Sequence, residues 1–77
     1  MSINVIFFGQ LEDLTGTDKI QYQLQPDTNH LIAQMEIRYP RLVNASYTIA
    51  VNKVMIKQNT ILNAGATVAL LPPFSGG

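Results

Sequence analysis

The sequence predicts an α+β domain, in which a mixed β-sheet carries one main helix packed on one of its faces. Three observations support this prediction. Segments near both ends of the chain alternate apolar and polar residues with the period that is typical of strands. One segment in the middle has helical spacing and a proline at its end. At 77 residues, the chain is long enough for one domain and no more.

The first part of the chain predicts a hairpin. Residues 2–8 alternate, and Gly9 interrupts them before a short helical turn at residues 10–14 that ends near Gly16. Residues 18–25 alternate more clearly, which predicts a half-buried edge strand paired with the first. The apolar residues that alternate along these two strands are Ile3, Val5, Phe7, Ile20, Tyr22 and Leu24.

A single helix is predicted between Pro26 and Pro40. Asp27 or Thr28 is the expected N-cap, because a short polar side chain there can accept a hydrogen bond from a free amide of the first turn. Pro40 ends the helix, since the residue before a proline is pushed out of helical geometry. The apolar face consists of Leu31, Met35 and Tyr39, with Ile32 beside them.

Further strands follow the helix. The pattern predicts a tight turn at Asn52-Lys53, a short extended piece at residues 60–62 and another turn at residues 63–65. The strands are expected at residues 47–51, 54–57 and 67–71. The order of two strands, one helix and further strands is that of the β-grasp, ubiquitin-like fold. We therefore expect a β-grasp domain at residues 1–71, followed by an extended C-terminal tail at residues 72–77, called the tail below.

Composition excludes several classes of function. Five basic and five acidic residues are scattered along the chain, whereas nucleic-acid binding requires concentrated positive charge. The apolar run at residues 3–8 is too short for a signal peptide or a membrane span, so we expect no membrane partner and a cytoplasmic protein. The chain has no cysteine, which excludes disulfides, thiolate metal sites and thiol nucleophiles. Any sulfur that it carries must therefore sit on a carboxyl group.

The tail is the part of the sequence with the clearest chemistry. Pro72-Pro73 stops the last strand and favours an extended chain. Gly76-Gly77 has no side chains, so its backbone and carboxylate can enter a channel too narrow for other residues. The alternative is an inert, frayed terminus, because small residues are commonly tolerated at chain ends.

Several stretches, taken in order, carry a resemblance to a known family. They are Ile6-Phe7-Phe8-Gly9-Gln10-Leu11, Leu14-Thr15-Gly16, Tyr39-Pro40-Arg41-Leu42, Ala50-Val51-Asn52-Lys53 and the ending Val68-Ala69-Leu70-Leu71-Pro72-Pro73-Phe74-Ser75-Gly76-Gly77. Together they resemble the small subunit of molybdopterin synthase, a family that ends in an apolar strand, two prolines, two variable residues and Gly-Gly. The chain differs from the usual family pattern at Glu12-Asp13, where a basic residue is often found, and at residues 63–66, where an acidic turn is common.

The resemblance implies a sulfur carrier. In that family, a ubiquitin-activating-like enzyme consumes ATP to adenylate the C-terminal carboxylate, here that of Gly77, and a sulfur donor converts it to a thiocarboxylate. The tail residues Phe74, Ser75 and Gly76 would then enter the large subunit, where cyclic pyranopterin monophosphate receives the sulfur in molybdenum cofactor biosynthesis. The resemblance further implies a heterotetrameric sulfurtransferase whose carrier subunit is not catalytic alone and binds no cofactor.

A separate prediction concerns the face of the sheet that the helix does not cover. If the inward residues are Val5, Phe7, Val54, Ile56, Val68 and Leu70, then the outward ones are Ile6, Phe8, Met55, Ala69 and Leu71. Scattered surface hydrophobes would be ordinary, but several of them beside the start of the tail predict a docking patch. The expected partner interface comprises Phe8, Met55, Leu71, Pro72 and Pro73.

The remaining polar residues are not expected to act in catalysis. His30 has no acidic partner in view and is predicted to be a surface residue, while Asp27 is predicted to be a cap. The neighbouring carboxylates Glu12 and Asp13 point in different directions on a helix, so no metal site is predicted. Three alternatives to the molybdopterin carrier stay open. They are a sulfur carrier of the thiamine pathway, a ubiquitin-like modifier joined to lysines through Gly77, and an interaction module with an inert tail.

Overall fold

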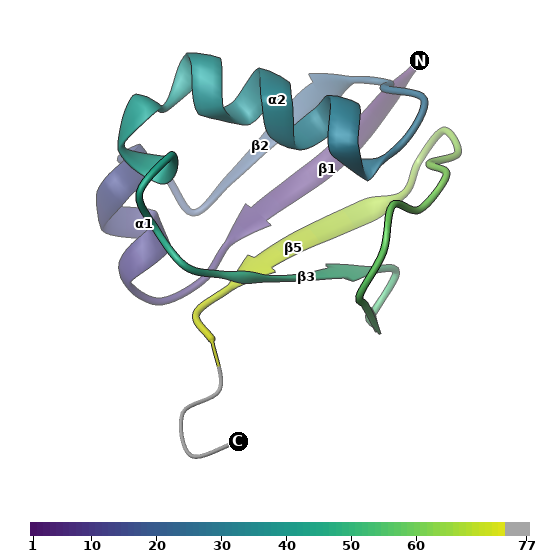
Figure 1. Cartoon of the computed structure of the whole chain (residues 1–77). Helices are drawn as coiled ribbons and strands as arrows, with labels where there is room; N and C mark the ends of the chain where they lie inside the picture. Colours follow the sequence, from purple (N-terminus) through teal and green to yellow (C-terminus); the bar gives the residue numbers. More distant parts are fainter. Residues whose placement is uncertain (74–77) are drawn as a thin grey trace.

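One long helix lies across one face of a five-stranded sheet in the computed structural model, which describes residues 1–73 (Figure 1). The first elements are β1 (Ser2–Phe7), α1 (Gln10–Thr15) and β2 (Lys19–Gln23). The main helix α2 (Thr28–Arg38) and a short 3₁₀ turn, η1 (Pro40–Leu42), follow. The sheet is completed by β3 (Thr48–Val51), β4 (Val54–Ile56) and β5 (Thr67–Leu71).

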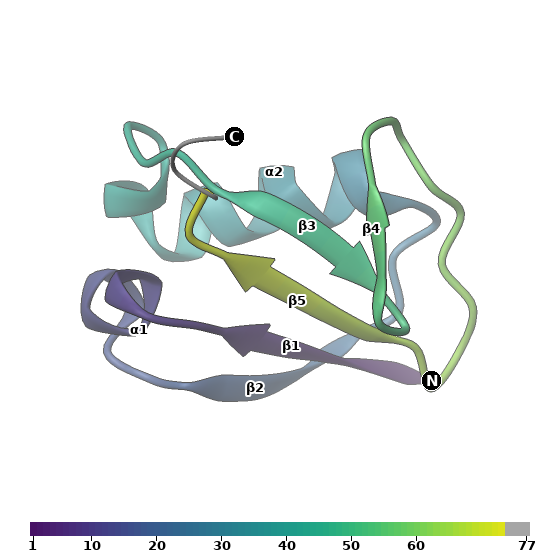
Figure 2. The same ribbon diagram turned by 90° about the horizontal axis from the view of Figure 1, so that it is seen from below.

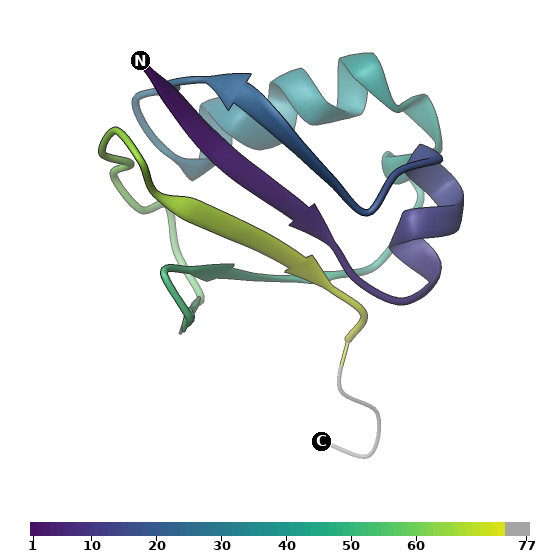
Figure 3. The same cartoon turned by 180° about the vertical axis from the view of Figure 1, so that it is seen from behind.

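The strand order in the sheet is β2-β1-β5-β3-β4. β1 and β5 are parallel and the other neighbouring pairs are antiparallel, so the sheet is mixed (Figure 2). This confirms the α+β prediction and the β-grasp order of elements, and it confirms β2 as an edge strand paired with β1. Because β1 and β5 run parallel to each other, both strands end at the same end of the sheet, beside α1 (Figure 3).

The core lies between α2 and the inner face of the sheet. The side chains that fill it from the sheet and α2 are fully or almost fully buried: Ile3, Val5, Phe7, Leu31, Met35, Val68 and Leu70. Tyr39 closes one end, with its ring edge-on to that of Phe7 and 5.5 Å between the ring centroids, a favourable aromatic geometry. The predicted inner faces of the first strand, the last strand and the helix are thus confirmed.

Among the residues predicted to point inward, Val54 is the one that is largely exposed. Val54 pairs with Val51 across the β3–β4 ladder and so lies in the inner row, yet 64% of it is exposed. β4 is an edge strand, so Val54 has a neighbouring strand on one side only. Val54 therefore lies on the inward side of β4, as predicted, but it is not covered, because alternation indicates the side of a strand and not how far the covering layer extends.

The first turn of α2 is capped by residues from two segments. Asp27 is the N-cap, and its carboxylate accepts a hydrogen bond of 2.9 Å from the amide of His30. The side-chain oxygen of Asn59 accepts hydrogen bonds from the amide of Asn29 at 2.9 Å and from the hydroxyl of Thr28 at 3.2 Å. The predicted N-cap is confirmed, and the β4–β5 connection adds a cap that the sequence pattern did not indicate.

Asn52 and Lys53 form the tight turn between β3 and β4, as predicted. Both have positive φ, at 49° and 72°, which is the conformation of two-residue hairpin turns that match strand twist. Asn52 also ties this turn to β5. Its amide donates to the carbonyl of Thr67 at 2.8 Å, and its side-chain oxygen accepts from the amide of Thr67 at 2.9 Å.

Candidate functional site

β5 is the middle strand of the sheet, and the tail begins where β5 ends. The carbonyl of Leu70 accepts a hydrogen bond of 3.0 Å from the amide of Phe8, just past the end of β1. On its other side, Leu71 pairs with the first residue of β3. Pro72 is half-buried and Pro73 is exposed. The end of β5 is therefore held between two strands, and the chain emerges from the sheet at Pro72.

The turn between β1 and α1 lies against Pro72. Gly9 in this turn has φ of 57° and ψ of −134°, a conformation that L-residues rarely adopt. A Cβ atom on Gly9 would lie 2.8 Å from Cγ of Pro72, whereas non-bonded carbon atoms normally stay about 3.5–4.0 Å apart. The missing side chain of Gly9 is what lets the proline ring approach this turn.

Figure 3 shows the face of the sheet that lies away from α2. One row of residues crosses four strands, because the register pairs Ile6 with Ala69, Ala69 with Ala50, and Ala50 with Met55. Paired residues of neighbouring strands point to the same face. The register therefore brings together Ile6, Met55 and Ala69, which the alternation had placed on the outer face.

Phe8 lies just past the end of β1, and Leu71 is the last residue of β5, directly before Pro72. Phe8 is 45% exposed and Met55 is 44% exposed, while Leu71 is half-buried. Ala50 lies between β5 and β4 on this face and is only 6% exposed. Ala50 was not predicted to lie on the outer face, although its alternation with Ile49 and Val51 was a usable signal. We call the outer-face residues Ile6, Phe8, Ala50, Met55, Ala69 and Leu71 the outer patch.

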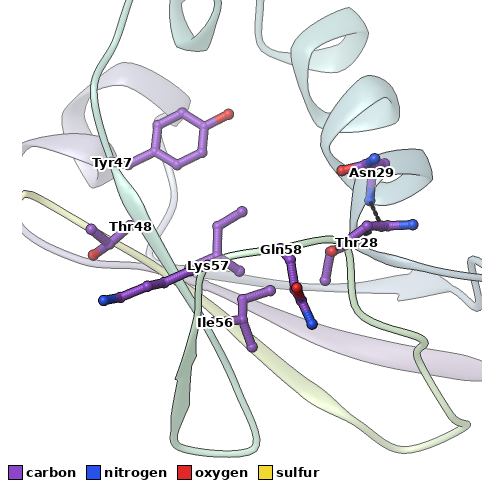
Figure 4. A pocket seen from close by; sticks show the side chains of 9 residues that line it. Thr28, Asn29, Tyr47, Thr48, Ile56, Lys57 and Gln58 are labelled. Carbon is purple, nitrogen blue, oxygen red and sulfur yellow. Dashed lines mark hydrogen bonds between the residues drawn. The ribbon is translucent and has the colours of Figure 1, made fainter.

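A cleft of about 280 Å³ lies between the first turn of α2 and strands β3 and β4 (Figure 4). Tyr47 and Lys57 line it from the strand side, and Thr28 and Asn29 line it from the helix. The amides of both helix residues already donate hydrogen bonds to the β4–β5 connection, so those two donors are taken. Burial, with a smaller contribution from the charge of Glu36, raises the pKa of Tyr47. We assign this cleft to the packing of the β4–β5 connection and not to the site.

His30 is not the isolated residue that the sequence predicted. Its Nδ1 lies 2.7 Å from a carboxylate oxygen of Asp27. Hydrogen bonds, first from the backbone amide of His30 and then from its ring, lower the pKa of Asp27 from its usual 3.8 to about 2. The expectation that His30 lacks an acidic partner was wrong, because the N-cap side chain folds back over the first helical turn. This pair lies at the start of α2, whereas the tail starts at the other end of the sheet (Figure 1).

The residue predicted to carry the sulfur, Gly77, and the tail residues predicted to enter the large subunit lie outside the described residues. They are Phe74, Ser75, Gly76 and Gly77. Within residues 1–73, no three His, Asp or Glu side chains gather in a way that could hold a metal ion. In the same part of the chain, no helix is both long enough and apolar enough to cross a membrane.

The family model described as the ThiS family matches residues 5–77. The chain belongs to the ThiS family. Two curated relatives are each named molybdopterin synthase sulfur carrier subunit. The one from Mycobacterium tuberculosis is 30% identical, over 100% of this chain and 99% of its own length. The one from Escherichia coli is 31% identical, over 97% of this chain and 99% of its own length. These matches confirm the family that the sequence motifs indicated.

Solved structures share the fold of this family member. A Pyrococcus furiosus protein, provisionally named molybdopterin converting factor subunit 1, superimposes with a TM-score of 0.87 at 21% identity, over 96% of this chain and 99% of that one. The small archaeal modifier protein 1 of Methanosarcina acetivorans superimposes with a TM-score of 0.83 at 22% identity, over 99% and 96% of the two chains. At these identities the likeness shows the fold alone, and it confirms the β-grasp.

A third solved structure holds two different subunits. It is the complex of subunits 1 and 2 of the molybdopterin-converting factor from Helicobacter pylori. The matching chain of that complex is 28% identical to this one and superimposes with a TM-score of 0.74, over 100% of both chains.

Proposed function

We propose that the chain is the sulfur-carrier subunit of a molybdopterin synthase and that the carboxylate of Gly77 carries the sulfur. The observation that carries this proposal is where the tail starts. It continues from a central strand, against Gly9 and beside the exposed apolar residues of the outer patch. In a chain whose relatives are named as sulfur carriers, this arrangement suits a tail that must reach into a partner from a rigid base.

The proposed loading step explains why a chain without cysteine can carry sulfur. A carboxylate is a poor electrophile, so it must first be activated. On a ubiquitin-activating-like enzyme, the Gly77 carboxylate attacks the α-phosphorus of ATP, and pyrophosphate leaves. A hydrosulfide equivalent from the sulfur donor then attacks the acyl carbon of the adenylate, AMP leaves with the bonding electrons, and loss of the proton on sulfur gives a thiocarboxylate. The ATP is thus bound and consumed by the activating enzyme.

In the proposed transfer step, the thiocarboxylate sulfur attacks an oxygen-bearing carbon of cyclic pyranopterin monophosphate inside the large subunit. The C–S bond forms as the C–O bond breaks, the oxygen leaves with the bonding electrons, and the carrier stays joined to the product through a thioester. Water then attacks the acyl carbon of the thioester and breaks the acyl–sulfur bond, so that the carrier regains its carboxylate and the sulfur stays on the precursor. A dithiolene contains a pair of sulfur atoms, so each product consumes a pair of carriers, which fits a heterotetramer. In this proposal the inserted residues are Phe74 to Gly77, and the docking residues are Phe8, Met55, Leu71, Pro72 and Pro73.

Within this division of labour the chain supplies and positions the reacting atom. The Helicobacter pylori complex, in which a homologue is bound to subunit 2, supports a large subunit as the partner. In the described residues, the imidazole of His30 is engaged by Asp27 at the far end of the sheet. Proton transfer and the stabilisation of negative charge are therefore assigned to the large subunit.

The test has two stages. The chain is first incubated with ATP, the activating enzyme and a sulfur donor, and its intact mass is measured. We expect the mass increase that corresponds to one oxygen replaced by sulfur. The loaded chain is then mixed with cyclic pyranopterin monophosphate, with and without the large subunit, and dithiolene is expected only when the large subunit is present.

Each alternative predicts a different result. An unchanged mass in the first stage would refute the carrier proposal and favour an interaction module. Dithiolene formed equally fast without the large subunit would refute the division of labour. Sulfur transfer to a thiazole synthase in place of the large subunit would indicate the thiamine pathway, and lysine-linked conjugates in cell extract would indicate a modifier.

A further inference from the structure

Gly9 is unusual among the glycines of the described chain. Gly9, Gly16 and Gly65 all have positive φ, at 57°, 80° and 83°. A Cβ atom would meet nothing within 4 Å at Gly16 or Gly65, but at Gly9 it would lie 2.8 Å from the ring of Pro72. Backbone conformation alone accounts for a glycine at the first two positions. At Gly9 there is a second reason for a glycine, because the ring of Pro72 lies where a side chain would be.

We propose that Gly9 is a positioning residue for sulfur transfer, because its bare Cα sets the place and direction in which Pro72 leaves the sheet. This inference rests on the proposed function, since it matters only if the end of the tail reacts. The reacting carboxylate belongs to Gly77, five positions beyond Pro72. A displacement at Pro72 is passed on through Pro73, whose ring restricts the chain in the same way.

The turn that contains Gly9 is anchored, so it cannot easily retreat from the proline. The carbonyl of Gly9 accepts a hydrogen bond of 3.1 Å from the amide of Glu12, and the carbonyl of Phe8 accepts one of 3.1 Å from Leu11. Leu11 is fully buried in the core. With the turn fixed to α1 and to the core, a side chain on Gly9 would displace Pro72, which is only half-buried.

The matched variants are Gly9→Ala and Gly65→Ala. Both place an L-residue at positive φ, so both strain the backbone, but only the first also collides with Pro72. Gly65 precedes β5, at the opposite end of that strand from the tail. A third variant, made by chemical synthesis, carries D-alanine at position 9. The backbone angles there are the mirror image of an ordinary extended conformation, and the D-methyl group occupies the other position on Cα.

The measurement is sulfur transfer in a single turnover, with thiocarboxylated chain and saturating large subunit, together with the Kd of the complex. We expect Gly9→Ala to lower the saturated rate by about tenfold to a hundredfold, as small misplacements of a reacting group do, with a much smaller change in Kd. Gly65→Ala should transfer at the wild-type rate, even though its thermal stability falls. The D-alanine variant should stay close to the wild type.

Pro72→Ala provides a second, independent perturbation in case Gly9→Ala does not fold. It removes the ring and leaves the β1–α1 turn unchanged, so it should also lower the saturated rate. A wild-type rate in a folded Gly9→Ala or Pro72→Ala chain would overturn the inference while the proposed function stands. An equal loss with L- and D-alanine would also overturn it. If the wild-type chain itself transfers no sulfur to the precursor, the proposed function fails and the inference falls with it.

Discussion

Met55 and Val54 are adjacent on β4 and point to opposite faces of the sheet. Met55 pairs with Ala50 in the outer patch, whereas Val54 pairs with Val51 in the inner row. Both are apolar and exposed, at 44% and 64%. Met55→Asp and Val54→Asp are thus a matched pair of substitutions. If the outer patch docks the large subunit, the first should weaken the complex and the second should not.

The expected size of the effect follows from the exposed area. Fully burying a Met side chain is worth about 1.5–3 kcal/mol, so docking over the exposed 44% of Met55 contributes ~1 kcal/mol. An aspartate in the same place leaves a buried, unpaired acceptor, which costs a further ~1–3 kcal/mol. Met55→Asp should therefore weaken binding by at least ~2 kcal/mol, or about 30-fold in Kd.

Isothermal calorimetry of each variant with the large subunit measures this difference, and thermal unfolding of the isolated chain controls for folding. Each substitution should lower the free energy of unfolding by ~1 kcal/mol, because part of each side chain is buried in the isolated domain. Equal Kd values for Met55→Asp and wild type would refute the docking patch. A larger loss of affinity for the large subunit in Val54→Asp than in Met55→Asp would mean that the partner binds the inner side of this edge strand.

Three further predictions concern the tail and the cap of α2. Deleting Gly77, or adding one residue after it, should abolish sulfur transfer in the coupled assay and leave the melting temperature unchanged; transfer by the shortened chain would refute the carrier mechanism. Asn59→Ala removes the oxygen that accepts hydrogen bonds from the hydroxyl of Thr28 and the amide of Asn29. It should therefore lower the free energy of unfolding by ~1 kcal/mol and the melting temperature by ~4–8 °C. The control Asn44→Ala, at an exposed position, should change neither. Because the pKa of Asp27 falls from 3.8 to about 2 on folding, its stabilising effect is present above about pH 4 and is lost as the pH falls towards 2. The free energy of unfolding of Asp27→Asn should accordingly fall less steeply than that of the wild type as the pH is lowered across that range. The same pH dependence in both proteins would contradict this role of Asp27.

Local patterns in the sequence were enough to predict most elements. Residues 2–8 were correctly predicted to have one buried face, because side chains of a strand alternate whatever its neighbours are. Asp27 and Pro40 bounded α2 correctly for reasons internal to a helix, namely a free amide at its start and steric conflict at its end. The extended piece at residues 60–62 is present as a single bridge between Ile61 and Asp27.

The chemistry proposed for the tail also depends on the sequence alone. The resemblance of its motifs to a sulfur-carrier family implied that Gly77 carries the sulfur, and the absence of cysteine is consistent with sulfur held on a carboxyl group. Two prolines before these glycines indicate an extended segment by their own covalent geometry. None of these statements requires knowledge of which residues lie next to each other in space.

The tertiary structure decided which distant segments meet. The parallel pairing of β1 with β5 places Gly9 against Pro72, and the position of β4 at an edge leaves Val54 exposed. The cap from Asn59 likewise comes from a connection that folds back onto α2. Such contacts depend on how whole apolar faces can be buried together and on which strand becomes an edge. Alternation within a single segment contains no information about its partner, so the surroundings of the tail could be determined only once all five strands were in register.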